Sequence, residues 1–249
     1  MSVIAFTPAE LAEMFAKIER EVASAAGSGE VLDMLTHAAT AMVPGAKYAG
    51  ISMGRGSKFV TVAATDEVVH EVDAIQYQQG SGPCVDAIVE DTVFNAGDLS
   101  VDSRWPHFGR EAAEKTGIVS MLSFRLYMET DAELVAGLNL YSSERGAFDE
   151  ASEIVGTLLA TYGALAVANA TAREKAGNLT VALQSSREIG IAMGVLMNRY
   201  RVTREQAFDL LRIASQNTHR KLAVIASHVA DTGELPTPSQ HSQRERPQG

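Results

Sequence analysis

Residues 191–229 read IAMGVLMNRYRVTREQAFDLLRIASQNTHRKLAVIASHV, and this stretch decides the fold of the C-terminal part of the chain. Small and aliphatic residues recur there at steps of three and four, a spacing that predicts helices. Thr203 and Gln206 form a capping-box pattern that opens a second helix, and Asn217-Thr218 precedes a third. This stretch contains too few ionisable groups to form a convincing catalytic pocket. We therefore expect a compact three-helix binding module with arginines on its turns.

A longer periodic pattern leads into this module from Asp149. Apolar or small residues alternate at steps of four and three; they are Leu158, Tyr162, Leu165, Asn169, Ala172, Ala176, Leu179, Leu183, Ser186, Gly190, Met193 and Met197. This heptad-like seam favours a coiled coil that pairs two copies of the chain over residues 154–197. A polar residue such as Asn169 could fix its register. Two ordinary helices with a joint at Gly177-Asn178 are the alternative.

The N-terminal part mixes helices and strands. Thr7 and Pro8 open a helix that ends by residue 24, and a second helical run follows Gly27-Ser28-Gly29. Further helices are predicted over 84–90 and 108–116, and strands over 47–53, 59–64, 68–76, 92–95, 120–127 and 133–141, with a polar loop at Glu129–Asp131. Sequential strands flanked by helices indicate an α+β fold with a central antiparallel sheet.

Charge is divided unequally along the chain. Residues 1–176 carry a formal charge of −13 and residues 177–249 carry +3, although the whole chain is at −10. This asymmetry predicts a division of labour between the two parts. No apolar run approaches a membrane span, no secretory signal opens the sequence, and a single cysteine excludes an internal disulfide. We therefore expect a cytoplasmic protein that does not enter a membrane.

The three-helix stretch resembles the ANTAR family of RNA-binding antiterminators. The matching residues are Ala192, Gly194, Leu196, Met197, Ala207, Phe208, Leu210 or Leu211, Arg212, Ala214, Arg220, Lys221 and Leu222. Met193 departs from the family, in which this position is often basic. The resemblance implies binding to paired hairpin loops in nascent RNA, which keeps a terminator from forming.

Candidate RNA contacts follow from this resemblance. Phe208 and Arg212 lie one turn apart and could form a stacking platform for unpaired bases. The residues that could contact phosphates are Arg199, Arg201, Arg204, Arg220 and Lys221. Core packing of Phe208, and solvated surface charge for each cation, are the alternatives at these positions.

Residues 25–172 resemble a GAF domain. The motifs that carry the resemblance are GSGPCVDAI (80–88), DLSVDSRWPHF (98–108), GIVSMLSFRL (117–126) and GLNLYSSERGAF (137–148). The expected organisation is an N-terminal helix (1–24), this α+β domain, an all-α ANTAR-like domain (173–235) joined to it by a long helix, and a disordered tail (236–249). GAF domains bind small molecules or dimerise, so an unknown small-molecule or protein signal is implied. The motif of cyclic-nucleotide-binding members is missing.

No constellation of residues indicates catalysis. The sequence has no Ser-His-Asp order, CxxC or HExxH motif, and a lone Cys84 is more often an inert core residue than a sensor. Asp98 and Asp102 fit turn roles better than a metal site. We expect no enzyme activity, cofactor or metal. The alternatives are a DNA-binding regulator that uses the same C-terminal helices and a ligand sensor without a nucleic-acid role.

Overall fold

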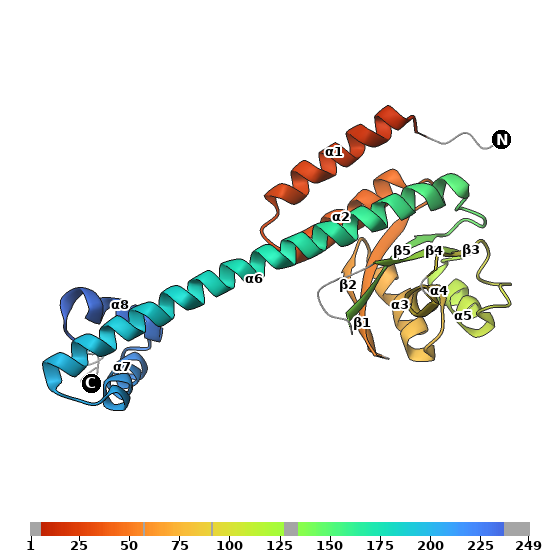
Figure 1. Ribbon diagram of the computed structural model, residues 1–249. Coiled ribbons are helices and arrows are strands. Elements are labelled where there is room, and N and C mark those ends of the chain that lie inside the picture. Colours follow the sequence, from red (N-terminus) through yellow and green to blue (C-terminus); the bar gives the residue numbers. More distant parts are fainter. Residues whose placement is uncertain (1–5, 57, 91, 127–133, 237–249) are drawn as a thin grey trace, which may run out of the picture. The chain divides into compact units, whose positions relative to one another are not determined.

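The computed structural model describes residues 6–56, 58–90, 92–126 and 134–236. It divides into two compact units, Met1–Glu174 and Lys175–Gly249 (Figure 1). The predicted loop at 129–131 and the predicted tail from residue 237 on lie outside the described residues.

A five-stranded antiparallel sheet forms the centre of the first unit, in the strand order β2-β1-β5-β4-β3. The strands are β1 (Tyr48–Arg55), β2 (Lys58–Ala64), β3 (Phe94–Ala96), β4 (Ser120–Leu126) and β5 (Leu134–Ser142). The predicted central antiparallel sheet is therefore confirmed.

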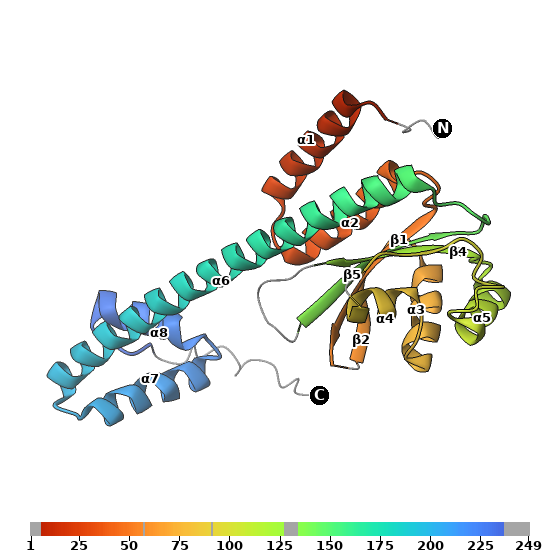
Figure 2. The ribbon, with the colours of Figure 1, turned by 45° about the vertical axis from the view of Figure 1, so that its right-hand side comes forward.

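Helices cover both faces of this sheet (Figure 2). On one face lie α2 (Ser28–Met42) and the first half of α6 (Glu150–Tyr200), packed on inward residues such as Ile51 and Leu138, which are direct cross-strand partners. Helix α1 (Pro8–Ser24) packs on the outside of these two helices. The packing is tight, because a Cβ added at Gly163 of α6 would lie 2.9 Å from Leu35 Cδ1 of α2. On the other face lie α3 (Glu67–Gln79), α4 (Pro83–Glu90) and α5 (Pro106–Thr116).

The prediction of a strand over residues 68–76 is wrong, because this segment is helix α3. The Asp66 side chain caps the helix by accepting a hydrogen bond from the Val68 amide at 3.0 Å. Val69, Val72 and Ile75 are buried three residues apart, as on a helix face, and not at the step of two that a half-buried strand would show. Gly80, with a φ of 63°, ends the helix in the left-handed conformation.

The second unit is a three-helix arrangement built from the end of α6, α7 (Arg204–Thr218) and α8 (Leu222–Thr232). The Thr203 hydroxyl accepts from the Gln206 amide at 3.3 Å and the Gln206 side chain accepts from the Thr203 amide at 3.0 Å, so the predicted capping box is confirmed. The buried core consists of Ala192, Leu196, Ala207, Leu211, Ala214, Ile225, Ala226 and Val229.

Helix α6 runs without interruption through Gly177 and Asn178, so the alternative of two helices with a joint there is wrong. Among the described residues, α6 is also the one helix long and apolar enough by composition to cross a membrane. Half of that apolar window is buried inside the protein, as in the core helix of a folded domain.

Candidate nucleic-acid interface and buried polar cluster

The outer face of α7 carries an aromatic ring between two arginines. Arg204, Phe208 and Arg212 follow one another at steps of four residues, which places them on neighbouring turns of one helix face. The buried positions Ala207 and Leu211 lie beside this face, so the core fixes its orientation. Phe208 is 40% exposed, and both arginines are exposed. The possibility that Phe208 is a buried core residue is therefore wrong.

The structure groups the seven predicted RNA contacts at three places along α7. Arg199, Arg201 and Arg204 lie where α6 meets α7, Phe208 and Arg212 lie on α7, and Arg220 and Lys221 lie in the turn to α8. Because α7 has 15 residues, the two terminal groups are separated by roughly 22 Å along its axis.

Two of the predicted cations already have partners within the protein. The Arg199 guanidinium donates to the Gly233 carbonyl at 3.0 Å and pairs with Glu234 at 2.9 Å, which ties the end of α6 to the end of α8. Arg212 pairs with Asp209 at 2.9 Å on the surface of α7. Within the described ranges, the remaining four cations are exposed and form no ion pair; they are Arg201, Arg204, Arg220 and Lys221.

A second site, which the sequence did not predict, is a buried polar cluster between the sheet and helices α3 and α4. Its centre is the fully buried Asp73 carboxyl group. One carboxyl oxygen accepts from the Gln76 side chain at 2.8 Å and from the Tyr141 hydroxyl, and the other accepts from the Thr61 hydroxyl at 2.6 Å and the Tyr77 hydroxyl at 3.2 Å. The Ser52 hydroxyl donates a fifth hydrogen bond at 3.4 Å, and burial raises the pKa of Asp73 despite these donors.

Cys84, on α4, borders the same cluster. Its thiol accepts a hydrogen bond from the Asn139 amide at 3.1 Å and is fully buried. Burial, together with the neighbouring Asp73 carboxylate, raises the pKa of the Cys84 thiol to about 12. The thiol is thus protonated at neutral pH, as expected for an inert core cysteine and not for a nucleophile.

Two buried polar atoms of the described residues have no hydrogen-bond partner in the protein, Ser123 Oγ and Asn139 Oδ1. Ser123 and Asn139 are direct partners across β4 and β5, so their side chains point to the same face of the sheet. The other end of the Asn139 amide bonds Ser52 at 2.9 Å and Cys84. Unpaired buried polar atoms are costly, and here they mark the place where the cluster could take up a water or a ligand group.

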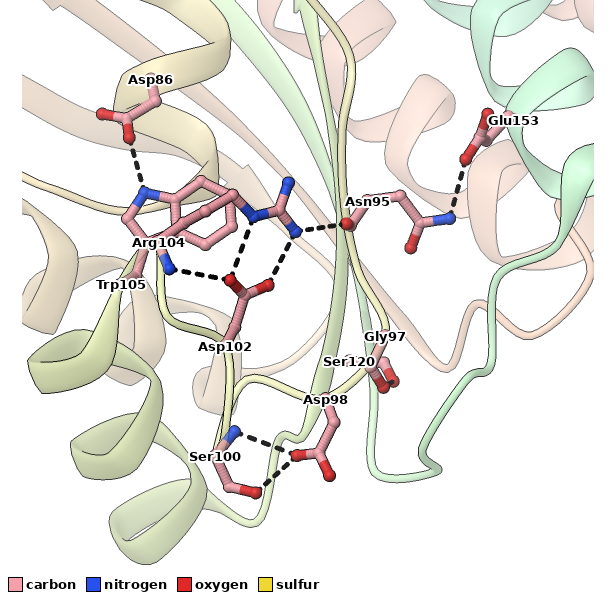
Figure 3. A network of polar contacts seen from close by, with 10 residues as sticks. All are labelled: Asp86, Asn95, Gly97, Asp98, Ser100, Asp102, Arg104, Trp105, Ser120 and Glu153. Atoms are coloured by element: carbon pink, nitrogen blue, oxygen red, sulfur yellow. Dashed lines mark hydrogen bonds and ion pairs between the residues drawn. The ribbon is translucent and has the colours of Figure 1, made fainter.

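A polar network connects α4 with the first turn of α6 (Figure 3). The Trp105 indole donates to Asp86 of α4, and the neighbouring Arg104 guanidinium lies 4.4 Å from the Trp105 ring centre. Arg104 also pairs with Asp102 and donates to the Asn95 carbonyl at 2.7 Å. The Asn95 side chain in turn donates to Glu153 of α6 at 2.8 Å.

Asp98 and Asp102 both stabilise turns through local hydrogen bonds. Asp98 accepts from the Ser100 amide at 3.0 Å and pairs with Arg145 at 2.6 Å. Asp102 accepts from the Arg104 amide at 3.0 Å. These bonds satisfy the carboxylates locally, and they hold the loop that leads into α5.

Sequence reasoning missed the Asp73 cluster because residues 68–76 were assigned to a strand. A signal was nevertheless present. Asp73, Gln76 and Tyr77 stand at steps of three and four, which on a helix places three polar groups on one face. Their partners Thr61 and Tyr141 come from strands β2 and β5, far away in the sequence, and only the sheet topology brings them together.

Comparison with known proteins agrees with both units. Residues 25–168 match the family model of a GAF domain, and residues 177–229 match that of an ANTAR domain. Among curated proteins, none matches the sequence.

Two similar solved structures cover most of the first unit. The GAF domain of a phosphoenolpyruvate-protein phosphotransferase from Coxiella burnetii has 18% sequence identity and a TM-score of 0.51, over 66% of this chain and 96% of that one. The free methionine-R-sulfoxide reductase from Neisseria meningitidis has 16% identity and a TM-score of 0.50, over 70% and 99%. At these identities the likeness is one of fold. The chain belongs to the GAF family, and an ANTAR domain formed by the end of α6, α7 and α8 follows its GAF domain.

Proposed function

We propose that this protein is a signal-responsive, RNA-binding regulator of transcription antitermination. Its ANTAR domain binds paired hairpin loops in nascent RNA, and its GAF domain controls that binding. The observation that carries the proposal is the exposed row on α7, where Phe208 stands between Arg204 and Arg212. A half-exposed aromatic flanked by guanidinium groups offers stacking and phosphate contacts together, which unpaired loop bases require.

The distribution of charge supports RNA as the partner of the second unit alone. Four of the predicted RNA contacts form no ion pair within the described ranges, and they lie in the turns next to α7 or at its first residue: Arg201, Arg204, Arg220 and Lys221. The first unit is strongly acidic, which disfavours nucleic acid there. Four or five phosphate contacts give only modest affinity at physiological salt, so tight binding needs two ANTAR domains acting together.

A homodimer through α6 over residues 154–197 supplies this second domain. Four leucines of the predicted seam are exposed in the single chain: Leu158 at 46%, Leu165 at 62%, Leu179 at 60% and Leu183 at 63%. Leaving so many leucines on one helix face in water is unfavourable, and pairing with a second copy removes them from water. Leu179 and Leu183 also lie in a stretch of α6 that has no buried residue from 172 to 184.

The GAF domain receives the signal, an unidentified small molecule or protein. Its buried polar cluster around Asp73, with the unpartnered Ser123 and Asn139 atoms beside it, is the part of the first unit best suited to hold a small polar ligand. The Arg104–Asn95–Glu153 contacts connect this region with α6. The protein acts in the cytoplasm, where nascent transcripts are made, and a membrane is not among its partners.

We do not assign an enzymatic activity to the GAF fold. A sulfoxide reductase shares the fold, but the only thiol of this chain is buried, and its pKa of about 12 keeps it protonated. A protonated thiol is not a nucleophile. Turnover that disappears in a Cys84→Ala variant would overturn this assignment.

A gel shift with the full chain tests the proposal. The probe is an RNA of two hairpins with six-base loops, and the variants are Phe208→Ala and Arg212→Ala. Ile213→Ala is the matched control, because Ile213 is an equally exposed apolar residue on the opposite side of α7. Both test variants should weaken binding roughly 5- to 150-fold, the range expected for one lost base stack, while Ile213→Ala should not. Undiminished binding by both variants would exclude α7 as the RNA platform.

A further inference from the structure

A groove lies between helices α1 and α2 of the first unit. Its volume is about 500 Å³, within the range of roughly 300–1,000 Å³ that is usual for small-molecule sites. Half of its apolar side chains are methionines, which are unbranched and adapt to irregular apolar shapes. The apolar lining of this α1–α2 groove consists of Met14, Ile18, Met34, Ala38, Ala41 and Met42.

The two ends of the α1–α2 groove differ in character. A short turn joins α1 to α2, so the last turn of α1 lies beside the first turns of α2. Glu21, Glu30 and Asp33 therefore line the end near this turn, whereas Met14 and Met42 line the far end. From residue 30 to residue 42, α2 rises about 18 Å. The groove thus has an acidic end and an apolar end.

Two carboxylates at the acidic end are not neutralised by a cation. Lys17 lies 3.9 Å from Glu21 and offsets that charge. Glu30 accepts a hydrogen bond from a backbone amide of the turn at 2.7 Å. Within the described ranges, neither Glu30 nor Asp33 forms an ion pair. The acidic end therefore attracts a positive charge and repels a negative one.

We propose that the α1–α2 groove is a binding site for a small amphipathic cation. The apolar body of this ligand lies over Met34 and Met42, which removes apolar surface from water on both sides. Its cationic group lies beside Glu30 and Asp33. The charge of the acidic end then determines which of several apolar molecules is bound.

The size of the groove favours a small molecule over a partner helix. A helix with its side chains is about 10 Å wide and rises about 16 Å in three turns, so its volume is roughly 1,300 Å³. This is more than twice the volume of the groove. A compact molecule can be enclosed between α1 and α2, whereas a helix could only lie across their surface.

The α1–α2 groove is separate from the Asp73 cluster, which lies on the other face of the sheet next to α3 and α4. It is nevertheless close to α6. Phe15 of α1 packs edge-to-face against Tyr162 of α6, with ring centres 5.8 Å apart. A ligand that moves α1 therefore acts on the helix that leads to the ANTAR domain. The site itself does not depend on RNA binding, and it is tested without RNA.

Three probes of matched shape test the site on the full chain. Phenylbutylamine has a cationic end, phenylbutanol a neutral end and phenylbutyrate an anionic end, on the same apolar body. NMR of methyl-labelled methionine follows their binding, because Met14, Met34 and Met42 line the groove. Met121 in the sheet and Met193 in α6 do not line it, and they serve as internal controls.

Two variants with matched controls locate the site. Ala41→Trp fills the apolar end, and Ala74→Trp places the same ring at an exposed alanine of α3. Asp33→Lys reverses a charge at the acidic end, and Glu71→Lys makes the same kind of change at an exposed position of α3. Unfolding midpoints are measured for all four variants, to show that each chain is folded.

The amine should shift the three groove methyls and leave Met121 and Met193 unchanged. It should bind at least about tenfold more tightly than the acid, with the alcohol between them. Ala41→Trp should abolish binding of all three probes. Asp33→Lys should weaken binding of the amine and remove the preference for it over the acid. Ala74→Trp and Glu71→Lys should bind like the wild type.

The proposal is overturned by unshifted groove methyls, by equal affinity for the amine and the acid, or by full affinity in a folded Ala41→Trp chain. If Ala41→Trp lowers the unfolding midpoint, the exposed Asp33→Lys variant decides, and an unchanged preference for the amine overturns the proposal. Groove methyl shifts that change on dilution without a probe also overturn it, because a second copy of the chain would then occupy the groove. None of these results bears on RNA binding, so the proposed function is tested separately.

Discussion

The Asp73 carboxyl group illustrates how a single buried residue sets pH dependence. Five side chains donate to it, which favours the charged form, but its complete burial is the larger effect and raises its pKa. A carboxyl group with a raised folded-state pKa stabilises the fold fully at pH values below its unfolded pKa of about 3.9. That contribution declines as the pH rises through the folded pKa.

Comparison with Asp73→Asn isolates this effect, because the asparagine does not titrate. As the pH rises above the unfolded pKa of about 3.9, the free energy of unfolding of the wild type, relative to the variant, should decrease until the pH passes the raised folded-state pKa. The decrease amounts to about 1.4 kcal/mol for each pH unit over which the folded protein alone keeps the proton. Urea unfolding at several pH values measures it. A difference that stays constant with pH would mean that the carboxyl group is ionised throughout.

Cys84 should be chemically silent in the folded protein. Its raised pKa of about 12, set mainly by burial, leaves almost no thiolate at pH 8, and the same burial blocks access. We expect no modification by iodoacetamide at pH 8 on a timescale that completes the reaction in guanidinium chloride, as measured by mass spectrometry. Rapid labelling of the native chain would contradict the buried position and would restore a redox role for this residue.

Arg199 and Arg204 are expected to have different roles although both belong to the predicted RNA contacts. Arg199 is held by Gly233 and Glu234 at the end of α8, whereas Arg204 is exposed at the start of α7. Arg199→Ala should lower the unfolding free energy by less than about 1 kcal/mol, as for an exposed ion pair, with little change in RNA affinity. Arg204→Ala should weaken RNA binding and reduce its salt dependence by about one phosphate contact. Salt titrations of both variants, read by gel shift, measure these effects. Weakened RNA binding by Arg199→Ala, together with unchanged RNA binding by Arg204→Ala, would contradict this assignment.

At the scale of elements, the proposed dimer depends on the exposed seam of α6. Leu179 lies on the predicted seam and Val181 does not, yet both are similarly exposed in the single chain, at 60% and 66%. Leu179→Asp should therefore convert a dimer to a monomer, because it places a charge inside the paired seam, while Val181→Asp should leave the dimer intact. Sedimentation velocity distinguishes the two. A wild-type monomer, or equal effects of both variants, would exclude the seam as the dimer interface.

The helices and strands show which sequence signals are sufficient to predict an element of secondary structure. The capping box at Thr203 and the steps of three and four on α7 and α8 predicted the second unit well, because caps and periodicity are local properties. Helix α3 was missed because β-branched Val68, Val69 and Val72 between turn residues resemble a strand, and the helix depends on the Asp66 cap and on burial against the sheet. Only the α3 part of the polar cluster has a local signal in the sequence; the whole cluster could not be predicted, since it requires β2, β5 and α3 to meet. The oligomeric state and the proposed domain boundaries stay predictions.

For the whole molecule, we propose that an acidic GAF domain controls a small ANTAR domain that binds RNA. We expect the second domain to prefer looped RNA to DNA, because its exposed α7 face carries Phe208 between two arginines. On that face Arg204 and Arg212 flank Phe208, without the Asn or Gln that reads adenine edges in a major groove.

The most direct test is a fluorescence anisotropy titration of the full chain at 150 mM salt, against a two-hairpin RNA and against duplex DNA of equal length and sequence. We expect at least tenfold tighter binding to the RNA than to the DNA, and we expect this preference to be lost when the loop bases are paired. Equal affinity for both nucleic acids, or tighter binding to the DNA, would contradict it.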